Sequence, residues 1–273
     1  MSARASDLLK NIRRAPEILR CAREASRWPQ ITSAYLGFST LSYPCLLHLR
    51  GGDGIRLHEL TDLKTFWQIF LRRVYHVEAS DRTILDIGAN VGLFSLYAAR
   101  RAPTARVYAV EPFPSTFERL VEVVRDHHLI ERVTCINCAI TGNGETRLMR
   151  SDPLPSQRRA LVPLGKGTSG IQVQSKTLST LLREQGLNRV DLVKMDIEGG
   201  EYEVLLSTSP SVLRTIRRIA LEYHGDCTPH TKREIFDHLR DAGFEVTSDI
   251  HDRLGYGVAN ASLKASPNVG SQR

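Results

Sequence analysis

Short apolar segments alternate with amphipathic segments between about residue 81 and residue 264. The apolar segments are rich in β-branched residues and predict strands, whereas apolar residues three or four positions apart predict the helices between them. The expected strands are RTILDIG, ARVYAVEP, RVTCINCAI, VDLVKMDI, RRIALEYH, FEVTSDI and YGVANASLK. This alternation is typical of a doubly wound α/β fold, so we expect a mostly parallel, seven-stranded sheet with helices on both faces.

Residues 1–80 follow a different pattern and predict a small extension that packs on this core. The first 30 residues combine basic and apolar positions in the manner of an amphipathic helix. A short β-hairpin is expected around the turn Gly51–Gly54. The segment TDLKTFWQIFLRRVY then predicts a helix that is capped by Thr61 or Asp62.

The segment from residue 150 to residue 169 breaks the alternation, because it is rich in Pro, Gly and Arg and has no periodicity. A loop of this length in a compact domain is usually functional or disordered. It could form a lid or a wall of a substrate site, and a mobile excursion is an equal alternative. Residues 265–273 are expected to form a disordered tail, which leaves residues 81–264 as the main domain.

The composition is that of a soluble globular protein, with 41% hydrophobic and 25% charged residues. No apolar run approaches the ~20 residues that a membrane-spanning helix needs. The N-terminal sequence lacks the apolar stretch of a secretory signal, which favours the cytoplasm. Five scattered cysteines argue against a disulfide framework. Cys135 and Cys138 lie in a predicted strand and are interpreted as two small apolar residues of that strand rather than as a redox or zinc pair.

The net charge of +7 is unevenly distributed, since residues 1–30 hold seven basic and three acidic residues. A basic amphipathic helix of this kind could contact an anionic membrane surface or a partner. The favoured interpretation is a solvated helix that lies over the domain. Nucleic acid is not an expected partner, because the basic residues are not interleaved with aromatic ones.

The sequence ILDIGANVGLF carries the strongest functional signal. A predicted strand ends with Asp86, and Gly88 would allow a tight turn and the close approach of a ligand. Asn90 suits a left-handed backbone, and Gly92 permits close packing of helix on strand. The spacing D-x-G-x-N-x-G lacks the third glycine of a dinucleotide fingerprint. A carboxylate ahead of the first glycine would repel a pyrophosphate but suits an ammonium group, met directly or through water.

The next predicted strand ends with Glu111, about 20 residues downstream, where an acidic residue accepts hydrogen bonds from ribose hydroxyls in nucleotide-binding α/β folds. Together with the glycine-containing turn, it predicts a site for an adenosine-type cofactor. Pro112 and Ala139 are the remaining members of the predicted cofactor set.

With these elements placed, the sequence resembles the FkbM family of methyltransferases from about Leu47 to Lys264. The likeness is carried by LDIGANVGLFSLYAA, VYAVEPFPSTFERL, CAITGNGETRL, VDLVKMDIEGGEYEVL and GYGVANASLK. Its most specific part is K-x-D-x-E-G-x-E, formed by Lys194, Asp196, Glu198, Gly199 and Glu201. One departure is Thr-Leu-Ser at residues 177–179, where the family commonly has Thr-Leu-Asp. Serine also caps helices, so this change affects only a polar contact.

The resemblance implies the Rossmann-like class I methyltransferase fold, with S-adenosyl-L-methionine (SAM) as the methyl donor. It also implies O-methylation of a hydroxyl, often on a sugar, a glycan or a secondary metabolite, and it leaves the acceptor open. Two alternatives remain at this point. One is an NAD-dependent oxidoreductase, and the other is a non-catalytic nucleotide- or nucleic-acid-binding module on the same fold.

Methyl transfer to a hydroxyl requires that its proton be removed by a general base or with the help of a metal. Asp196 and Glu198 end one predicted strand, and Glu222 and His224 end another, so these four residues are the expected catalytic set. His224 is the preferred base, since an imidazole titrates near neutrality. Asp196 and Glu222 could orient it, anchor the acceptor or bind a divalent cation. Glu198 and Glu201 could instead do no more than cap the next helix.

Overall fold

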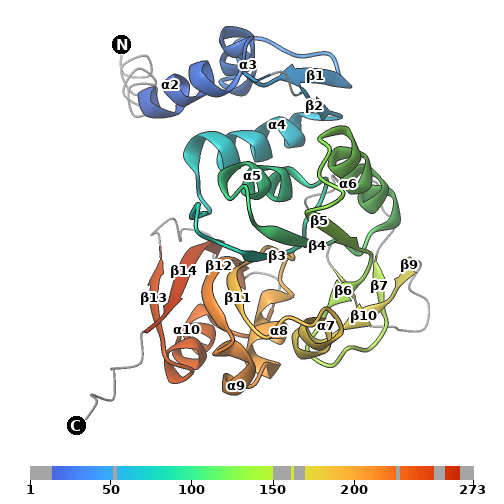
Figure 1. The fold of residues 1–273 in the computed structure, drawn as a ribbon, viewed down its shortest axis with the longest axis vertical. Coiled ribbons are helices and arrows are strands. Elements are labelled where there is room, and N and C mark those ends of the chain that lie inside the picture. Colours follow the sequence, from blue (N-terminus) through green and yellow to red (C-terminus); the bar gives the residue numbers. More distant parts are fainter. Residues whose placement is uncertain are drawn as a thin grey trace. The chain divides into compact units, whose positions relative to one another are not determined.

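A computed structural model describes residues 14–51, 54–149, 161–162, 170–225, 228–248 and 256–264. The chain forms two compact units, of which the first holds residues 1–76 with 125–127 and the second holds residues 77–124 with 128–273 (Figure 1). The division expected at residues 80 and 264 stays a prediction. The expected tail, residues 265–273, and the first 13 residues of the basic segment lie outside the described parts.

The first unit contains helices and one hairpin, namely α2 (Ala15–Glu24), α3 (Trp28–Tyr35), β1 (Cys45–His48), β2 (Gly54–Leu57), α4 (Leu60–Phe66) and the π-helix η1 (Trp67–Arg72). The predicted hairpin is confirmed, because β1 and β2 pair antiparallel. The predicted cap of α4 is wrong. The N-cap is Glu59, and Asp62 instead reaches back so that its Oδ2 accepts a hydrogen bond from the His58 amide at 2.7 Å.

The second unit is built on a seven-stranded sheet with the order β13-β14-β12-β11-β3-β4-β5. Its strands are β3 (Thr83–Ile87), β4 (Arg106–Val110), β5 (Val133–Ile136), β11 (Val190–Met195), β12 (Ile216–His224), β13 (Phe244–Ser248) and β14 (Tyr256–Leu263). Only β14 runs antiparallel to its neighbours within this sheet. The predicted mostly parallel α/β fold is therefore confirmed.

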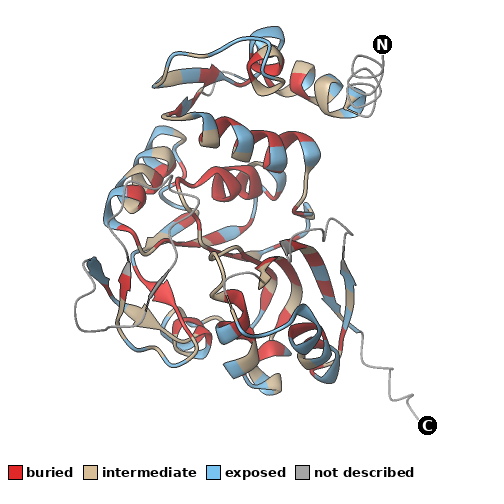
Figure 2. Ribbon diagram, turned by 180° about the vertical axis from the view of Figure 1, so that it is seen from behind, coloured by how far each residue is buried: buried red, intermediate tan, exposed pale blue. Residues whose placement is uncertain are grey.

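The helices of the second unit are α5 (Leu93–Arg101), α6 (Pro114–Asp126), α7 (Leu178–Glu184), α8 (Glu201–Ser207), α9 (Pro210–Leu213) and α10 (Lys232–Asp241). Burial follows the central strands and the sheet-facing sides of the helices (Figure 2). Strands buried on both faces explain the near-continuous apolar runs in the sequence. No helix in the described parts of the chain combines the length and the apolar composition needed to span a bilayer.

The segment RVTCINCAI is not the single strand that was expected. Strand β5 ends at Ile136, and β6 (Ala139–Ile140) pairs with β10 (Ser175–Lys176) in a separate small sheet. The side chain of Asn137 turns the chain here, because its Nδ2 donates to the carbonyls of Glu111 and Pro112. A third sheet joins β7 (Arg147–Met149) to β8 (Leu161–Val162) and β9 (Ile171–Val173). The rest of the expected 150–169 loop lies outside the described residues.

Cys135 and Cys138 are both free thiols, on either side of this turn. Burial raises the pKa of each thiol to about 11, so both stay protonated at neutral pH. The expected strand position is confirmed for Cys135, which is partly buried in β5, and is wrong for Cys138, which is buried between β5 and β6.

The strand order reverses between β3 and β11, because β4 and β5 lie on one side of β3 while β11 and β12 lie on the other. In open α/β sheets, ligands bind outside the carboxyl ends of the strands at such a point. The topology therefore directs attention to residues that follow β3, β4, β11 and β12.

Candidate active site

The glycine loop, residues 88–92, connects β3 to α5. The amides of Gly88 and Ala89 both donate to the carbonyl of Val110 at the end of β4, at 3.0 and 2.9 Å. Asn90 adopts a left-handed conformation with φ 50°, as its residue type predicts. Gly92 has φ 84° and is the N-cap of α5. The loop is thus a tight left-handed turn held against the neighbouring strand.

The expected tight turn at Gly88 is confirmed by its φ of 76°, and a close approach of the backbone adds a second requirement for glycine. A Cβ atom at this position would lie 1.9 Å from the carbonyl oxygen of Asp196, so the close approach is to the end of β11. At Gly92 a Cβ would lie 2.7 Å from Leu120 Cδ1, so the tight packing is against helix α6 rather than against a strand. The two glycines fix the loop between β11 and α6.

Asp86 is fully buried at the end of β3. Its Oδ2 accepts a hydrogen bond from Ser95 Oγ at 2.7 Å, and its Oδ1 lies 3.3 Å from Lys194 Nζ. Burial raises the pKa of Asp86, although Lys194 and Ser95 oppose the shift. Through Ser95 and Lys194 the carboxylate supports the loop, and its expected contact with an ammonium group, direct or through water, stays a prediction. The sequence did not single out Lys194 as a site residue.

Glu111 joins the glycine loop to the end of β4. Its Oε2 accepts a hydrogen bond from the Asn90 amide at 3.0 Å, and its Oε1 accepts one from the Phe113 amide at 2.9 Å. Burial raises the pKa of Glu111 to about 7. Nearby, the side-chain Oδ1 of Asn90 is buried and has no hydrogen-bond partner among the described residues. A hydroxyl or ammonium donor of a ligand would satisfy that oxygen.

Pro112 and Ala139, the other expected cofactor residues, flank the turn at Asn137. The carbonyl of Pro112 accepts from Asn137 Nδ2 at 3.1 Å, and the amide of Ala139 donates to the carbonyl of Gln174 at 2.7 Å. Asn137 was missed from the sequence, although an Asn directly after a strand is a turn signal. Ala139 is 1% exposed, and its expected contact with the cofactor stays a prediction.

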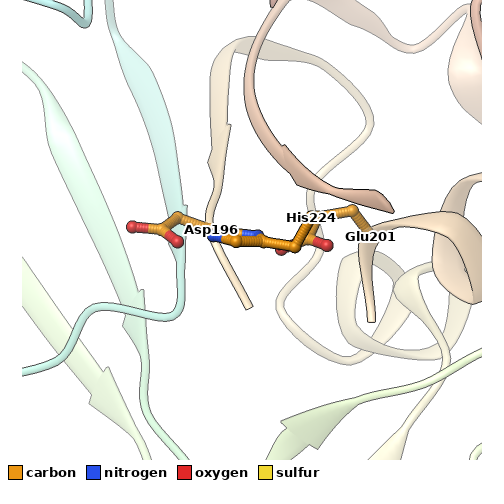
Figure 3. A group of neighbouring side chains, drawn as sticks. All are labelled: Asp196, Glu201 and His224. Atoms are coloured by element: carbon orange, nitrogen blue, oxygen red, sulfur yellow. The ribbon is translucent and has the colours of Figure 1, made fainter. Parts of the chain in front are cut away.

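The ends of β11 and β12 bring together four side chains, which we call the acceptor-side group: Asp196, Glu198, Glu201 and His224. Glu201 is fully buried, and its Oε1 lies 3.1 Å from His224 Nδ1. Glu198 Oε2 lies 3.7 Å from His224 Nε2. Figure 3 shows the imidazole ring of His224 between Asp196 and Glu201. Three of the four expected catalytic residues therefore meet, and Glu201 joins them.

Glu201 also shapes the turn that carries Asp196 and Glu198. Its Oε1 accepts from the Ile197 amide at 2.7 Å, and its Oε2 accepts from the Gly199 amide at 2.9 Å. Glu198 has φ 53°, a left-handed conformation that is uncommon for a residue of this type. The expectation that Glu201 serves the helix terminus agrees with these bonds, since it is the first residue of α8.

The reason given for His224 as the base is wrong. Burial lowers the pKa of His224, but the hydrogen bond and charge of Glu201, with the charges of Asp196 and Glu198, outweigh it and raise the pKa to about 9. The ring is therefore mostly protonated at neutral pH. Burial, together with the charge of Asp196, raises the pKa of Glu198 to about 7. Glu198 thus has the pKa near neutrality that the sequence analysis expected of His224.

Glu222, the fourth expected catalytic residue, lies beside this group. It is partly buried on β12, where Met195 pairs with Leu221 and the next position of β12 lies alongside Asp196, and its charge acts on both Lys194 and Glu198. Its catalytic role stays a prediction. Among the described residues, the side chains that could jointly bind a metal are Asp196, Glu201 and His224, whose candidate ligand atoms lie within 4.8 Å of one another. This set shares Asp196 with the expected cation pair Asp196 and Glu222, and that pair stays a prediction. Glu201 already accepts two backbone hydrogen bonds, so the hydrogen bonding accounts for this arrangement without a cation.

Comparison with known proteins settles the family. The model of the methyltransferase FkbM domain matches residues 86–246 of this chain, from the end of β3 to β13. The chain belongs to the FkbM methyltransferase family. The matched region contains the glycine loop, Glu111 and the whole acceptor-side group.

Three relatives illustrate the breadth of the family. Methyltransferase sdnD of Sordaria araneosa is 29% identical over 213 residues, which cover 67% of this chain and 82% of that protein. The 31-O-demethyl-FK506 methyltransferase FkbM of Streptomyces tacrolimicus is 25% identical over 209 residues, 66% of this chain and 78% of that protein. The hexuronic acid methyltransferase AglP of Haloferax volcanii is 24% identical over 168 residues, 59% of this chain and 64% of that protein.

For an FkbM-family methyltransferase the donor is SAM, and the site fits it. The unpartnered Oδ1 of Asn90 and the carboxylate of Glu111 offer acceptors for an ammonium group and for ribose hydroxyls. The oxidoreductase alternative is not favoured by the family or by the glycine spacing. The comparisons give no support for a divalent cation.

Proposed function

We propose that this FkbM-family methyltransferase transfers the methyl group of SAM to a hydroxyl oxygen of a sugar, a glycan or a secondary metabolite. The observation that carries the proposal is the meeting of Asp196, Glu198 and His224 beside the glycine loop. Carboxylates that line an acceptor site are suited to receive hydrogen bonds from hydroxyl groups. By their names, two relatives act on a 31-O-demethyl compound and on a hexuronic acid, which agrees with this class of acceptor.

On the donor side, Asn90 and Glu111 would hold the cofactor. When bound, SAM supplies an electrophilic methyl group on a sulfonium centre. Glu111 would accept hydrogen bonds from the ribose hydroxyls, and the glycine loop would keep SAM in place against the end of β3. Much of the rate of such a displacement comes from positioning the donor and acceptor in line.

On the acceptor side, we assign the base to Glu198. Its pKa of about 7 leaves a substantial ionised fraction at neutral pH, and its side chain is 27% exposed. The ideal pKa of a general base lies near the operating pH. Protonated His224 would sit between the carboxylates and limit their mutual repulsion, while Asp196 would orient the acceptor hydroxyl. Glu222 would support this set from within β12.

The test is methyl transfer from SAM labelled in its methyl group to a panel of mono- and oligosaccharides and other hydroxyl compounds. Glu198→Gln should lower kcat by roughly 100- to 10,000-fold, while the affinity for S-adenosylhomocysteine (SAH) changes by less than about twofold. Glu203→Gln is the matched control, since Glu203 lies on α8 but pairs with Arg147.

Two results would contradict the proposal. Label that is recovered on a nitrogen or carbon atom would exclude O-methylation. A Glu198→Gln variant with the turnover of the wild type would remove Glu198 as the base, and Asp196→Asn would then identify the remaining carboxylate.

A further inference from the structure

Lys194 is a buried lysine beneath the cofactor site. It is 4% exposed on β11, and in the sheet it pairs with Asp86 of β3. A buried ammonium group must be compensated by opposite charge and by hydrogen-bond acceptors. The groups that compensate the charge of Lys194 therefore indicate its role.

The ammonium group points at the glycine loop. Lys194 Nζ donates to the carbonyl of Gly88 at 2.7 Å and lies 3.5 Å from the carbonyl of Ile87. Its counter-ions are Asp86, at 3.3 Å, and Asp196, at 3.8 Å. One side chain thus touches the start of the glycine loop and both carboxylates beside it.

A second contact ties the same network to α5. Ser95 Oγ donates to Asp86 Oδ2 at 2.7 Å, and Ser95 lies in the first turn of the helix that the loop opens. The sequence of contacts Ser95–Asp86–Lys194–Gly88 therefore connects α5, β3, β11 and the loop. The backbone adds a further constraint, because Gly88 is packed against the carbonyl of Asp196.

Stability alone does not explain a charged pair at this position. Replacing a buried ion pair by apolar residues of similar volume is often neutral or stabilising. A charged pair whose cation donates to the loop carbonyl does something that an apolar pair cannot do, since it fixes the direction of that carbonyl.

We propose that Lys194 is a positioning residue for the cofactor, which holds the glycine loop through the Gly88 carbonyl with Asp86 as its counter-ion. The proposal rests on the proposed function in one respect, namely that the ligand of the loop is SAM. Lys194 comes from the strand that ends in the acceptor-side group, so it links the donor and acceptor halves of the site.

The test compares Lys194→Met with Arg218→Met. Arg218 pairs with fully buried Asp81 at 2.6 Å, just outside the amino ends of the strands, so its loss also weakens a buried pair but away from the loop. Lys194→Met should weaken SAH binding at least tenfold in calorimetry, and Arg218→Met less than twofold. Hydrogen exchange of the amides in residues 88–92 should accelerate at least tenfold in Lys194→Met only.

The exchange measurement needs no ligand, so it decides the inference even if the wild type fails to bind SAH, a result that would count against the proposed function alone. Because Lys194→Met leaves Asp86 without its cation, the double variant Asp86→Asn with Lys194→Met is made as well. It should be more stable than Lys194→Met but show the same rapid exchange and weak binding. Normal exchange in a folded variant, SAH binding within twofold of the wild type, equal losses in Arg218→Met, or a double variant that does not fold would each overturn the proposal.

Discussion

Substitution of Gly88 by alanine tests how the cofactor loop is fixed against β11. The left-handed conformation at φ 76° costs an L-residue roughly 1–2 kcal/mol. The added Cβ would also lie 1.9 Å from the Asp196 carbonyl oxygen, so restoring an ordinary contact of 3.4 Å requires a movement of about 1.5 Å. Overpacking of this kind costs about 1–3 kcal/mol more. Gly88→Ala should therefore lower the free energy of unfolding by roughly 2–5 kcal/mol.

Gly186 provides the control for this experiment. It has φ 65° after helix α7, and an added Cβ there has nothing within 4 Å. Gly186→Ala should lose only the conformational part, roughly 1–2 kcal/mol, in urea denaturation. Gly88→Ala should in addition bind SAH at least tenfold more weakly, because the loop that would hold the cofactor has to move to relieve the contact with Asp196. Equal unfolding free energies for the two variants, with normal SAH binding by Gly88→Ala, would refute the reasoning.

Two other predictions follow from single contacts. Glu111 has a pKa of about 7 and would accept ribose hydroxyls when ionised, so lowering the pH from 8 to 6 should weaken SAH binding about tenfold. In Glu111→Gln calorimetry should show no such dependence, and a wild-type affinity that is constant over this range would contradict the role. Thr177 Oγ1 accepts from the Thr180 amide at 3.1 Å as the N-cap of α7. Thr177→Ala should therefore lose about 1 kcal/mol in urea denaturation, and Ser179→Ala less.

The glycine loop could be predicted because its signals are local. A strand, a turn with Gly88 and Asn90, and a helix follow one another within 19 residues, from Thr83 to Arg101. The residue types at the left-handed positions are limited by sterics, so a single sequence reveals them. The mostly parallel sheet was predictable for a related reason, since strands that alternate with helices are joined by crossover connections.

The electrostatics of the site could not be predicted, because they depend on pairs that are distant in the sequence. Lys194 meets Asp86 only through the register of β11 on β3, 108 positions apart. His224 has its pKa raised because Glu201, at the start of α8, reaches its Nδ1. Residue type alone gives the ordinary pKa of an imidazole and says nothing about such a neighbour.

The alternation of residues along a strand could not show which partners Glu222 and His224 meet. Both point to the same side of β12. His224 lies at the strand end, where it reaches Glu198 and Glu201 after β11, whereas Glu222 lies alongside Asp196. The break between β5 and β6 was missed because it depends on a contact that is distant in the sequence, the hydrogen bond from Asn137 Nδ2 to the Glu111 carbonyl after β4. The apolar residues on both sides of Asn137 resemble one continuous strand.

Calorimetric titration with SAH and, separately, with NAD tests the central claim most directly. The predicted result is micromolar binding of SAH and no binding of NAD, with the SAH affinity reduced in Gly88→Ala. Binding of NAD without SAH would contradict the assignment of this site to SAM and, with it, the proposed methyl transfer.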